Sequence, residues 1–238
     1  MPSSPSRQAR LQSLIAKPFA HRGLHGPGRI ENSRAAFEAA IAADHGIELD
    51  VQASADGEAI VFHDSTLDRL TGDVGPICGL VAGELQRIRL KNSDETIPTL
   101  EEALNLIAGR APLLIEIKSG RPLYHQLCYW VAGVLRSYGG PVAVMSFNPR
   151  VGHWFARHHP DVLRGLVVTE NGKPSRGRLK RRLARWWSNP DFLAYDIRDL
   201  PSASARGLPV LTWTVRSADD RARAARHADQ IIYEALPG

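Results

Sequence analysis

The sequence lacks a long hydrophobic run. No segment approaches the ~18 to 20 consecutive apolar residues that a membrane-spanning helix needs. Near the N-terminus, the apolar part of the stretch 11–16 is too short and too polar for the core of a secretory signal. The sequence therefore predicts a cytoplasmic protein in which residues 1–17 form a lead or a short helix before the first strand.

Cysteine is also scarce. The two cysteines, Cys78 and Cys128, exclude a disulfide framework and a cysteine-rich zinc site, and they are typical of free thiols in a reducing compartment. The 238 residues are enough for one large domain, and 43% hydrophobic with 23% charged residues is an ordinary globular composition. The net charge of +5 favours solubility, or attraction of anionic substrates or surfaces.

Short apolar runs alternate with longer segments of helical period, which is the pattern of a parallel sheet with crossover helices. Eight strands are the number that a closed (β/α)₈ TIM barrel needs, and the chain length suits that α/β fold. We therefore expect a single barrel domain over residues 1–238. The predicted strands are 17–21, 47–51, 112–117, 141–146, 164–168, 192–197, 209–214 and 230–233.

Helices are predicted between these strands, and Thr99 is a plausible N-cap because Glu101 and Glu102 follow in the first turn. The predicted helices are 33–43, 100–108, 125–137, 149–158 and 218–227.

A hairpin is predicted after the second strand, where Asp56-Gly57 separates two apolar runs. A two-residue turn there would place His63 directly opposite Asp50. The following residues, 64–98, read as a long non-helical connection, and a connection of that length inside a compact domain is usually functional. We interpret 64–98 as a small insertion over the barrel mouth.

Three carboxylates are expected at that mouth. Glu48 and Asp50 stand two apart in one strand and share a face, and Glu116 shares a face with Lys118 in the next barrel strand. Charged residues near the carboxyl ends of barrel strands gather where active sites lie. The three carboxylates suit a hard divalent cation such as Mg²⁺ or Ca²⁺. The alternative is a set of structural ion pairs with Lys118 and nearby arginines.

The first strand ends in His21-Arg22-Gly23, which places a proton-transfer group beside a guanidinium that suits phosphate oxygens. His63 adds a second histidine near the carboxylates. Two histidines beside a metal and an arginine form the machinery for displacing a phosphoester, one accepting a proton and the other donating one.

In order along the chain, these residues resemble the glycerophosphodiester phosphodiesterase family, densely over 19–120 and more thinly afterwards. No single motif is decisive, but the ordered set is specific. The matching motifs are His21-Arg22-Gly23, Glu31-Asn32, Glu48-Leu49-Asp50-Val51, Asp56-Gly57, His63-Asp64, Leu67-Asp68-Arg69, Ile97-Pro98-Thr99-Leu100-Glu101-Glu102, Glu116-Ile117-Lys118, Ser146-Phe147-Asn148 and Trp213-Thr214-Val215.

The resemblance implies a barrel with an insertion after the second strand, and it implies roles for individual residues. Glu48, Asp50 and Glu116 match metal ligands, His21 and His63 match the general acid and base, and Arg22 and Lys118 match phosphate-binding positions. Glu31 matches a residue that could orient Arg22, with a helix-capping role for Glu31-Asn32 as the alternative. Trp213 would line the pocket for the glycerol moiety of the substrate. The alternative is that it only packs in the barrel.

Some positions depart from the family pattern. Ile30 and Ser33 stand where proline and threonine are common, and Arg216 stands where asparagine is common. The last strand ends in Tyr233-Glu234, where a small residue and an aspartate would be typical. These departures leave the alcohol group of the substrate open.

Residues 173–187 form a basic segment with apolar residues at helical spacing. We favour an outer barrel helix with its apolar stripe on the sheet and its charges in water. The alternative is peripheral contact with an anionic membrane, while nucleic acid is not expected because no binding motif accompanies the charge. The residues concerned are Lys173, Arg176, Arg178, Lys180, Arg181, Arg182 and Arg185, with Leu179, Leu183 and Trp186.

The sequence thus predicts a metal-dependent enzyme that hydrolyses a small-molecule glycerophosphodiester to sn-glycerol 3-phosphate and an alcohol. The alternatives are a lysophospholipase D or phosphodiester lyase on the same barrel, and a barrel that only binds phosphate or membrane. Paired proton-transfer groups argue against pure binding, which has no need of them.

Overall fold

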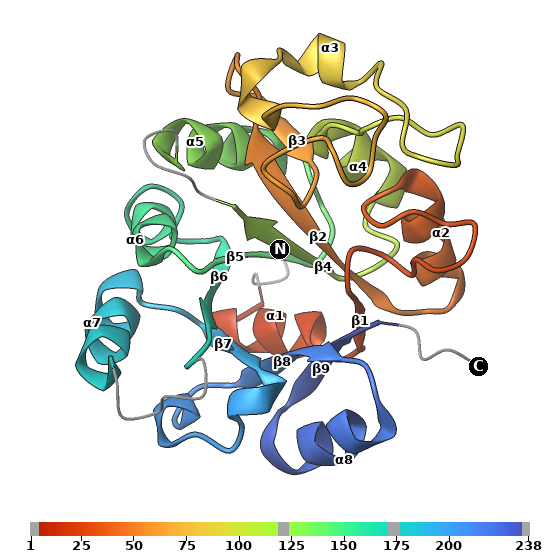
Figure 1. Ribbon diagram of the computed structural model, residues 1–238. Coiled ribbons are helices and arrows are strands. Elements are labelled where there is room, and N and C mark those ends of the chain that lie inside the picture. Colours follow the sequence, from red (N-terminus) through yellow and green to blue (C-terminus); the bar gives the residue numbers. More distant parts are fainter. Residues whose placement is uncertain (1–4, 119–123, 171–176, 235–238) are drawn as a thin grey trace.

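Eight parallel strands form a closed barrel in the computed structural model, which describes residues 5–118, 124–170 and 177–234 (Figure 1). Each strand pairs with the next, and β1 pairs with both β2 and β9, so that the ring closes. The predicted (β/α)₈ barrel and its eight strands are confirmed. They are β1 (Phe19–Ala20), β2 (Gly46–Ala53), β4 (Leu113–Ile117), β5 (Val142–Ser146), β6 (Leu163–Val168), β7 (Phe192–Asp196), β8 (Val210–Val215) and β9 (Gln230–Tyr233).

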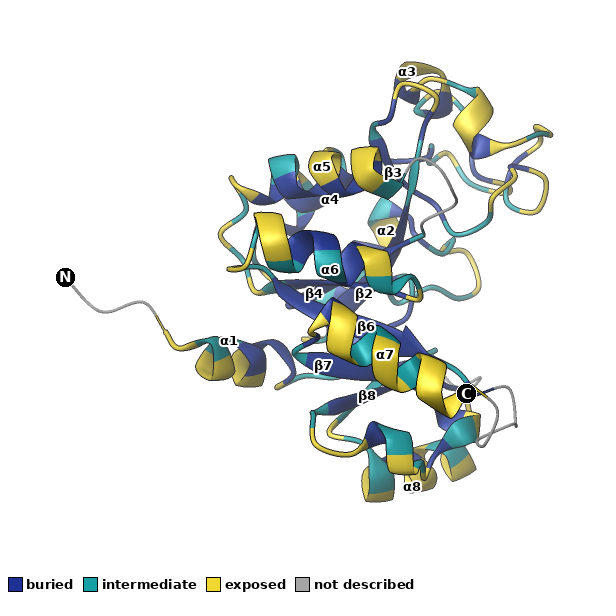
Figure 2. Ribbon diagram, turned by 90° about the vertical axis from the view of Figure 1, so that its left-hand side faces the viewer, coloured by how far each residue is buried: buried dark blue, intermediate teal, exposed yellow. Residues whose placement is uncertain are grey.

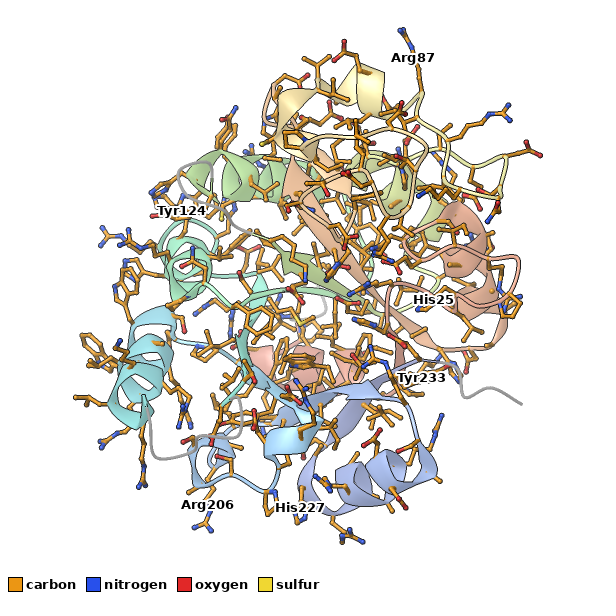
Figure 3. All side chains as sticks on the ribbon, viewed as in Figure 1. His25, Arg87, Tyr124, Arg206, His227 and Tyr233 are labelled. Atoms are coloured by element: carbon orange, nitrogen blue, oxygen red, sulfur yellow. The ribbon has the colours of Figure 1, made fainter. Side chains whose placement is uncertain are left out.

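The strands are buried on both faces, which explains their nearly continuous apolar runs. In β4, for example, Leu113 and Ile115 belong to the core between the sheet and the helices, whereas Leu114 belongs to the core inside the barrel. Side chains fill the middle of the ring (Figure 3). Because side chains alternate along a strand, the positions of Glu48, Asp50 and Glu116 place their carboxylates inside the barrel.

Helices cover the outside of the ring, and α2, α4, α6 and α8 begin at polar side chains that cap them. Thr99 caps its helix as predicted, since its hydroxyl accepts from the backbone N–H of Glu102 and the Glu102 carboxylate accepts from that of Thr99. None of the helices within the described ranges is long and apolar enough to cross a membrane. The helices are α2 (Arg34–Ala42), α4 (Leu100–Ile107), α5 (Tyr124–Leu135), α6 (Pro149–His158), α7 (Arg178–Ser188) and α8 (Ala218–His227), with 3₁₀ turns η2 (Ile197–Asp199) and η3 (Ala203–Ala205).

A short helix, α1 (Arg7–Leu14), closes the amino-terminal end of the barrel (Figure 2). Leu11 and Leu14 are buried and pack with Phe19 and other residues of the barrel interior. The floor of the barrel is therefore packed mainly with apolar side chains. The predicted short helix before the first strand is confirmed.

The predicted hairpin exists, but its register is wrong by one residue. Strand β3 (Ala59–Val61) pairs antiparallel with β2, with Val51 opposite Val61, and Phe62 donates its backbone N–H to the carbonyl oxygen of Asp50 at 3.1 Å. The loop contains three residues rather than two, because Ser54 pairs with Glu58. Three-residue hairpin loops are a common alternative to the two-residue turn that we predicted.

The segment between β3 and α4 lies beyond the carboxyl ends of the strands (Figure 2). It has its own small apolar core, which includes Phe62, Leu67 and Leu85. The expectation of a wholly non-helical connection is wrong, since the segment contains the 3₁₀ turn η1 (Ile77–Gly79) and the one-turn helix α3 (Ala82–Leu85).

The basic segment forms the predicted outer helix, α7, but the predicted orientation of its apolar stripe is wrong. Leu179, Leu183 and Trp186 are 67%, 55% and 79% exposed. The buried side of the helix presents Ser188, which packs so tightly against Gly152 of α6 that a Cβ on that glycine would lie 2.8 Å from the serine Cβ. Small residues therefore decide which face meets the barrel. Lys173 and Arg176 lie outside the described residues.

Candidate active site

Three carboxylates meet inside the mouth of the barrel. The β2–β4 register places Asp50 beside Glu116. Glu48 lies two residues earlier on the same face of β2 and is therefore deeper in the barrel. Glu48, Asp50 and Glu116 are 1%, 0% and 8% exposed, and one oxygen from each lies within 4.8 Å of the others. The predicted carboxylate cluster is therefore present as one buried group.

Burial controls the protonation of this cluster. Burial, and next the negative charge of Asp50, raise the pKa of Glu48 well above its usual value. Burial also raises the pKa of Glu116. Burial acts in the same sense on Asp50, but Lys118 and Arg22 outweigh it and lower the pKa of that carboxyl. Burial therefore favours the protonated forms of Glu48 and Glu116, and a nearby divalent cation would favour their ionised forms.

The donor atoms fit a hard divalent cation. Oε1 of Glu48 is buried and has no hydrogen-bond partner among the described residues. Oδ1 of Asp50 and Oε1 of Glu116 face the ammonium of Lys118 at 3.0 and 2.6 Å. An all-oxygen set with an unpartnered buried oxygen is suited to Mg²⁺ or Ca²⁺.

A second group of possible ligands is less suitable. His21, His25 and Glu234 also place one ligand atom each within 4.8 Å of one another. However, both carboxylate oxygens of Glu234 already accept hydrogen bonds from Arg216, at 2.7 Å each. We therefore assign the candidate metal centre to the three carboxylates.

Arg22 is held at the edge of the cluster by its unusual backbone and by two acids. Its φ of 56° lies in the left-handed region, and its backbone N–H donates to Oε2 of Glu48 at 2.9 Å. Nε lies 3.2 Å from Oδ2 of Asp50, and Nη1 donates to Oε1 of Glu31 at 2.7 Å. Glu31 thus fixes the guanidinium from the side away from the carboxylates. The capping alternative for Glu31-Asn32 is wrong, because Ser33 caps α2.

His21 is oriented by a partner from the far end of the chain. Nδ1 of His21 lies 2.9 Å from Oε1 of Glu234, whose pKa is lowered chiefly by that hydrogen bond and by Arg216. Because an ionised carboxylate only accepts, Nδ1 must donate, and Nε2 keeps its lone pair in the neutral ring. Nε2 lies 4.0 Å from Oε2 of Glu48, so it faces the carboxylate cluster. Burial lowers the pKa of His21, although Glu234 opposes that effect.

His63 is oriented in a similar way, but by residues that are close to it in the sequence. Nδ1 of His63 lies 2.7 Å from Oδ1 of Asp64, and Arg69 donates to Oδ2 of Asp64 at 2.5 Å. The hydrogen bond from Arg69 is the main cause that lowers the pKa of Asp64 to about 2. Gln52 of β2 donates to the carbonyl oxygen of His63 at 2.9 Å and fixes this stretch of chain. Burial lowers the pKa of His63 as well.

These groups line one cavity of about 260 Å³ at the mouth. Trp213 forms part of the wall, donates Nε1–H to the carbonyl oxygen of Ala194 at 2.9 Å, and meets Phe147 edge to face at 5.6 Å. Trp213 therefore both packs in the barrel and borders the cavity. The lining residues are His21, Arg22, Glu48, His63, Glu116, Lys118, Met145, Phe147, Trp213, Thr214, Arg216 and Ile232.

The structure brings all the predicted site residues to this end of the barrel, with Asp50 beneath the lining and Glu31 behind Arg22. The sequence interpretation missed the carboxylate–arginine pairs that orient the two histidines. These pairs are Glu234–Arg216 for His21 and Asp64–Arg69 for His63. It also missed Asn32, whose amide donates to Oδ2 of Asp50 at 3.1 Å. The signal for Glu234 and Arg216 was their departure from the family pattern, which pointed to a change at the mouth without showing what they contact.

The fold and this cavity define a β/α-barrel enzyme with a candidate metal centre at its mouth. The sequence model of the glycerophosphoryl diester phosphodiesterase family matches residues 21–234. The chain therefore belongs to that family, as the motifs had indicated.

Individual relatives agree with this assignment. The chain is 30% identical over 216 residues to a glycerophosphodiester phosphodiesterase of Caldanaerobacter subterraneus subsp. tengcongensis, which covers 86% of this chain and 88% of that protein. It is 27% identical to glycerophosphodiester phosphodiesterase 1 of Bos taurus over 273 residues, with 94% and 80% covered. A solved Oleispira antarctica phosphodiesterase in complex with the product sn-glycerol-3-phosphate shares the fold, with a TM-score of 0.79, 24% identity, and 93% and 94% of the two chains covered.

Proposed function

We propose that this protein hydrolyses glycerophosphodiesters to sn-glycerol 3-phosphate and a free alcohol with the help of Mg²⁺ or Ca²⁺. The observation that carries the proposal is the pair of histidines, His21 and His63, that face one cavity beside a buried carboxylate cluster. Family membership and the product bound to the Oleispira antarctica relative support the same reaction. A site that only bound phosphate would need the cations but not two oriented proton-transfer groups.

Glu48, Asp50 and Glu116 would hold the divalent cation. When bound, such a cation polarises a phosphoryl oxygen and makes the phosphorus more electrophilic. Arg22 and Lys118 supply the remaining positive charge, and the guanidinium of Arg22 matches the spacing of two phosphate oxygens. Trp213 and Phe147 offer an apolar wall for the carbon chain of the glycerol moiety.

The two histidines differ in exposure, which suggests their roles. The side chain of His21 is 11% exposed and that of His63 is 30% exposed. We assign the deeper His21 as the base that takes the proton from water, or from the adjacent glycerol hydroxyl in a cyclic-phosphate route. As the new P–O bond forms and the bond to the alcohol breaks, the protonated ring of His63, which Asp50 and Asp64 favour, gives its Nε2 proton to the departing alkoxide at the solvent side of the cavity.

Phosphorus NMR tests this reaction directly. Purified protein is incubated with glycerophosphocholine in Mg²⁺, in Ca²⁺ and in EDTA, and we expect a glycerol 3-phosphate signal that EDTA abolishes. A transient cyclic phosphate would identify the glycerol hydroxyl as the nucleophile. Lysophosphatidylcholine in the same assay separates the lysophospholipase D alternative, since that substrate has an acylated glycerol. No turnover of either substrate with either cation would contradict the proposal.

A matched pair of variants tests the role of His63. His63→Ala should reduce kcat by roughly 10²- to 10⁴-fold, the usual contribution of a positioned acid or base. His227→Ala changes a histidine on α8 that lies at the outer edge of the molecule (Figure 3) and should leave turnover unchanged. Near-normal turnover of His63→Ala would refute its assignment as the acid.

Three further expectations remain proposals: a single functional unit over residues 1–238, a cytoplasmic location, and peripheral membrane contact through 173–187. The described part of the last range, residues 177–187, belongs mostly to α7.

A further inference from the structure

The outer face of α7 is apolar, which is the reverse of an ordinary surface helix. Nine large hydrophobic side chains are exposed in the described part of the chain, and four of them belong to this helix. Leu179, Leu183 and Trp186 recur at helical spacing and are each more than half exposed, and Trp187 is 37% exposed. Figure 2 looks onto this side of the barrel, where α7 presents mostly exposed residues to the viewer.

Polar contacts hold the inner face of the helix. Arg185 donates to the carbonyl oxygen of Arg206 at 2.7 Å, and the guanidinium of Arg181 lies 3.6 Å from the carboxylate of Glu170. None of the stripe residues Leu179, Leu183 and Trp186 belongs to the core clusters of the described chain. A contiguous apolar stripe left in water is unfavourable and marks a surface that a partner covers.

Cationic side chains border the stripe. The sequence of α7 contains five arginines and lysines and no acidic residue. At 100° per residue, exposed Arg178 and Arg182 lie along one edge of the stripe and exposed Lys180 along the other. On the neighbouring helix α6, the guanidinium of Arg150 lies 5.9 Å from the centre of the Trp187 ring and extends the positive surface.

We propose that the outer face of α7, formed by Leu179, Leu183 and Trp186 with their cationic borders, docks onto an anionic lipid bilayer. The leucines and the indole would enter the boundary between headgroups and acyl chains, while the flanking cations reach the lipid phosphates. A second copy of this chain fits less well, because a symmetric contact would bring the cations of both copies together without an acidic partner on either helix.

Side-on docking would leave the catalytic mouth accessible. The amino-terminal end of α7 lies at the same end of the barrel as the mouth, and the helix runs along the flank (Figure 2). A bilayer against that flank would not cover the cavity that holds His21 and His63. The proposal is independent of the proposed hydrolysis, because binding to vesicles requires no turnover.

Vesicle co-sedimentation tests the docking surface. The full-length protein is mixed with vesicles of phosphatidylcholine alone, or of equal parts phosphatidylcholine and phosphatidylglycerol, at low and high salt. We expect binding to the anionic vesicles that weakens with salt. Failure to bind anionic vesicles at low salt, or equal binding to both compositions, would overturn the proposal.

Two variants separate the apolar and the charged contributions. The variant Leu179→Gln, Leu183→Gln, Trp186→Gln should lose more than about tenfold in partitioning, because the apolar anchor is removed. Its control, Val74→Gln with Val81→Gln, changes exposed apolar residues in the segment between β3 and α4 and should bind like the parent.

The charge variant, Lys180→Gln with Arg182→Gln, should lose roughly 30-fold, the effect of two surface cations. Its control removes two exposed arginines of α8, Arg223→Gln with Arg226→Gln, and should lose much less. Circular dichroism confirms that each variant is folded. If the apolar variant binds vesicles like the parent, or if light scattering shows a dimer that this variant dissociates, the bilayer is not the partner.

Discussion

Glu234→Gln is the most informative change at the active site, because it alters one atom and should reverse the tautomer of His21. In the parent, Glu234 accepts from Nδ1 of His21 at 2.9 Å and from Arg216 through both oxygens. Glutamine has one accepting oxygen and one donating nitrogen. Arg216 can only donate, so it will hold the amide oxygen and turn the amide nitrogen toward His21. Nδ1 must then accept, and the proton moves to Nε2.

The expected loss follows from the position of that proton. A neutral His21 with hydrogen on Nε2 has no lone pair facing the carboxylate cluster and cannot act as the base there. The variant should therefore lose most of what a positioned base contributes, roughly 10²- to 10⁴-fold in kcat. Substrate binding should change little, because Glu234 does not line the cavity.

Removing Arg216 as well provides the control. In the double variant Arg216→Gln, Glu234→Gln, the amide at position 234 is free to present its oxygen to Nδ1 of His21 and restore the parent tautomer. We expect the double variant to be at least about tenfold more active than Glu234→Gln alone, which is a strong coupling between neighbours. Steady-state kinetics with glycerophosphocholine measure both. The reasoning is refuted if Glu234→Gln stays within about threefold of the parent, or if the second change brings no recovery.

The pH profile gives an independent measure of the same contact. Burial lowers the pKa of His21, so the neutral base is available at pH 7 and is lost as the pH falls through that lowered value. Glu234 raises the pKa of His21 against this trend. In the double variant, the acid limb of kcat/KM should therefore shift to lower pH than in the parent.

Three other predictions concern the metal, the thiols and the core. Asp50→Asn should weaken Mg²⁺ or Ca²⁺ binding by about tenfold or more in calorimetry, because a fully buried carboxylate oxygen loses its charge; unchanged affinity would place the cation elsewhere. At pH 8, a thiol reagent should modify exposed Cys78 but not Cys128, whose pKa burial raises to about 12, and both should react in guanidinium. Phe155→Ala should lower the free energy of unfolding by about 3–5 kcal/mol in urea, whereas Tyr129→Ala, at a 63% exposed position, should change it by less than about 0.5 kcal/mol.

The barrel and its carboxylates are readable from the sequence because they depend on local periodicity. A buried strand appears in the sequence as an apolar run, and a spacing of two residues places Glu48 and Asp50 on the same face of their strand. The hairpin register is less secure, since the same Asp56-Gly57 pair fits loops of two or three residues. A single-residue slip was enough to make the predicted pairing of Asp50 with His63 wrong.

The orientation of α7 shows a different limit. Periodicity reveals that one face of the helix is apolar, but it does not say which face meets the barrel. That choice depends on the tight fit of Ser188 against Gly152, a contact between two helices that no single helix pattern contains. The expectation that apolar stripes face inward holds for most surface helices, and the exposed stripe of α7 is what motivates the proposed docking surface.

The two histidine sites differ in how much of the fold they require. His63, Asp64 and Arg69 lie within seven consecutive residues, so their contacts need only the local turn after β3. His21 and Glu234 are 213 positions apart and meet because β9 pairs with β1. The contact that orients the proposed base therefore requires a closed barrel, whereas the contacts of the proposed acid with Asp64 and Arg69 come from one short segment. The final strand therefore leads into the carboxylate that fixes the tautomer of His21, and this contact depends on closure of the ring.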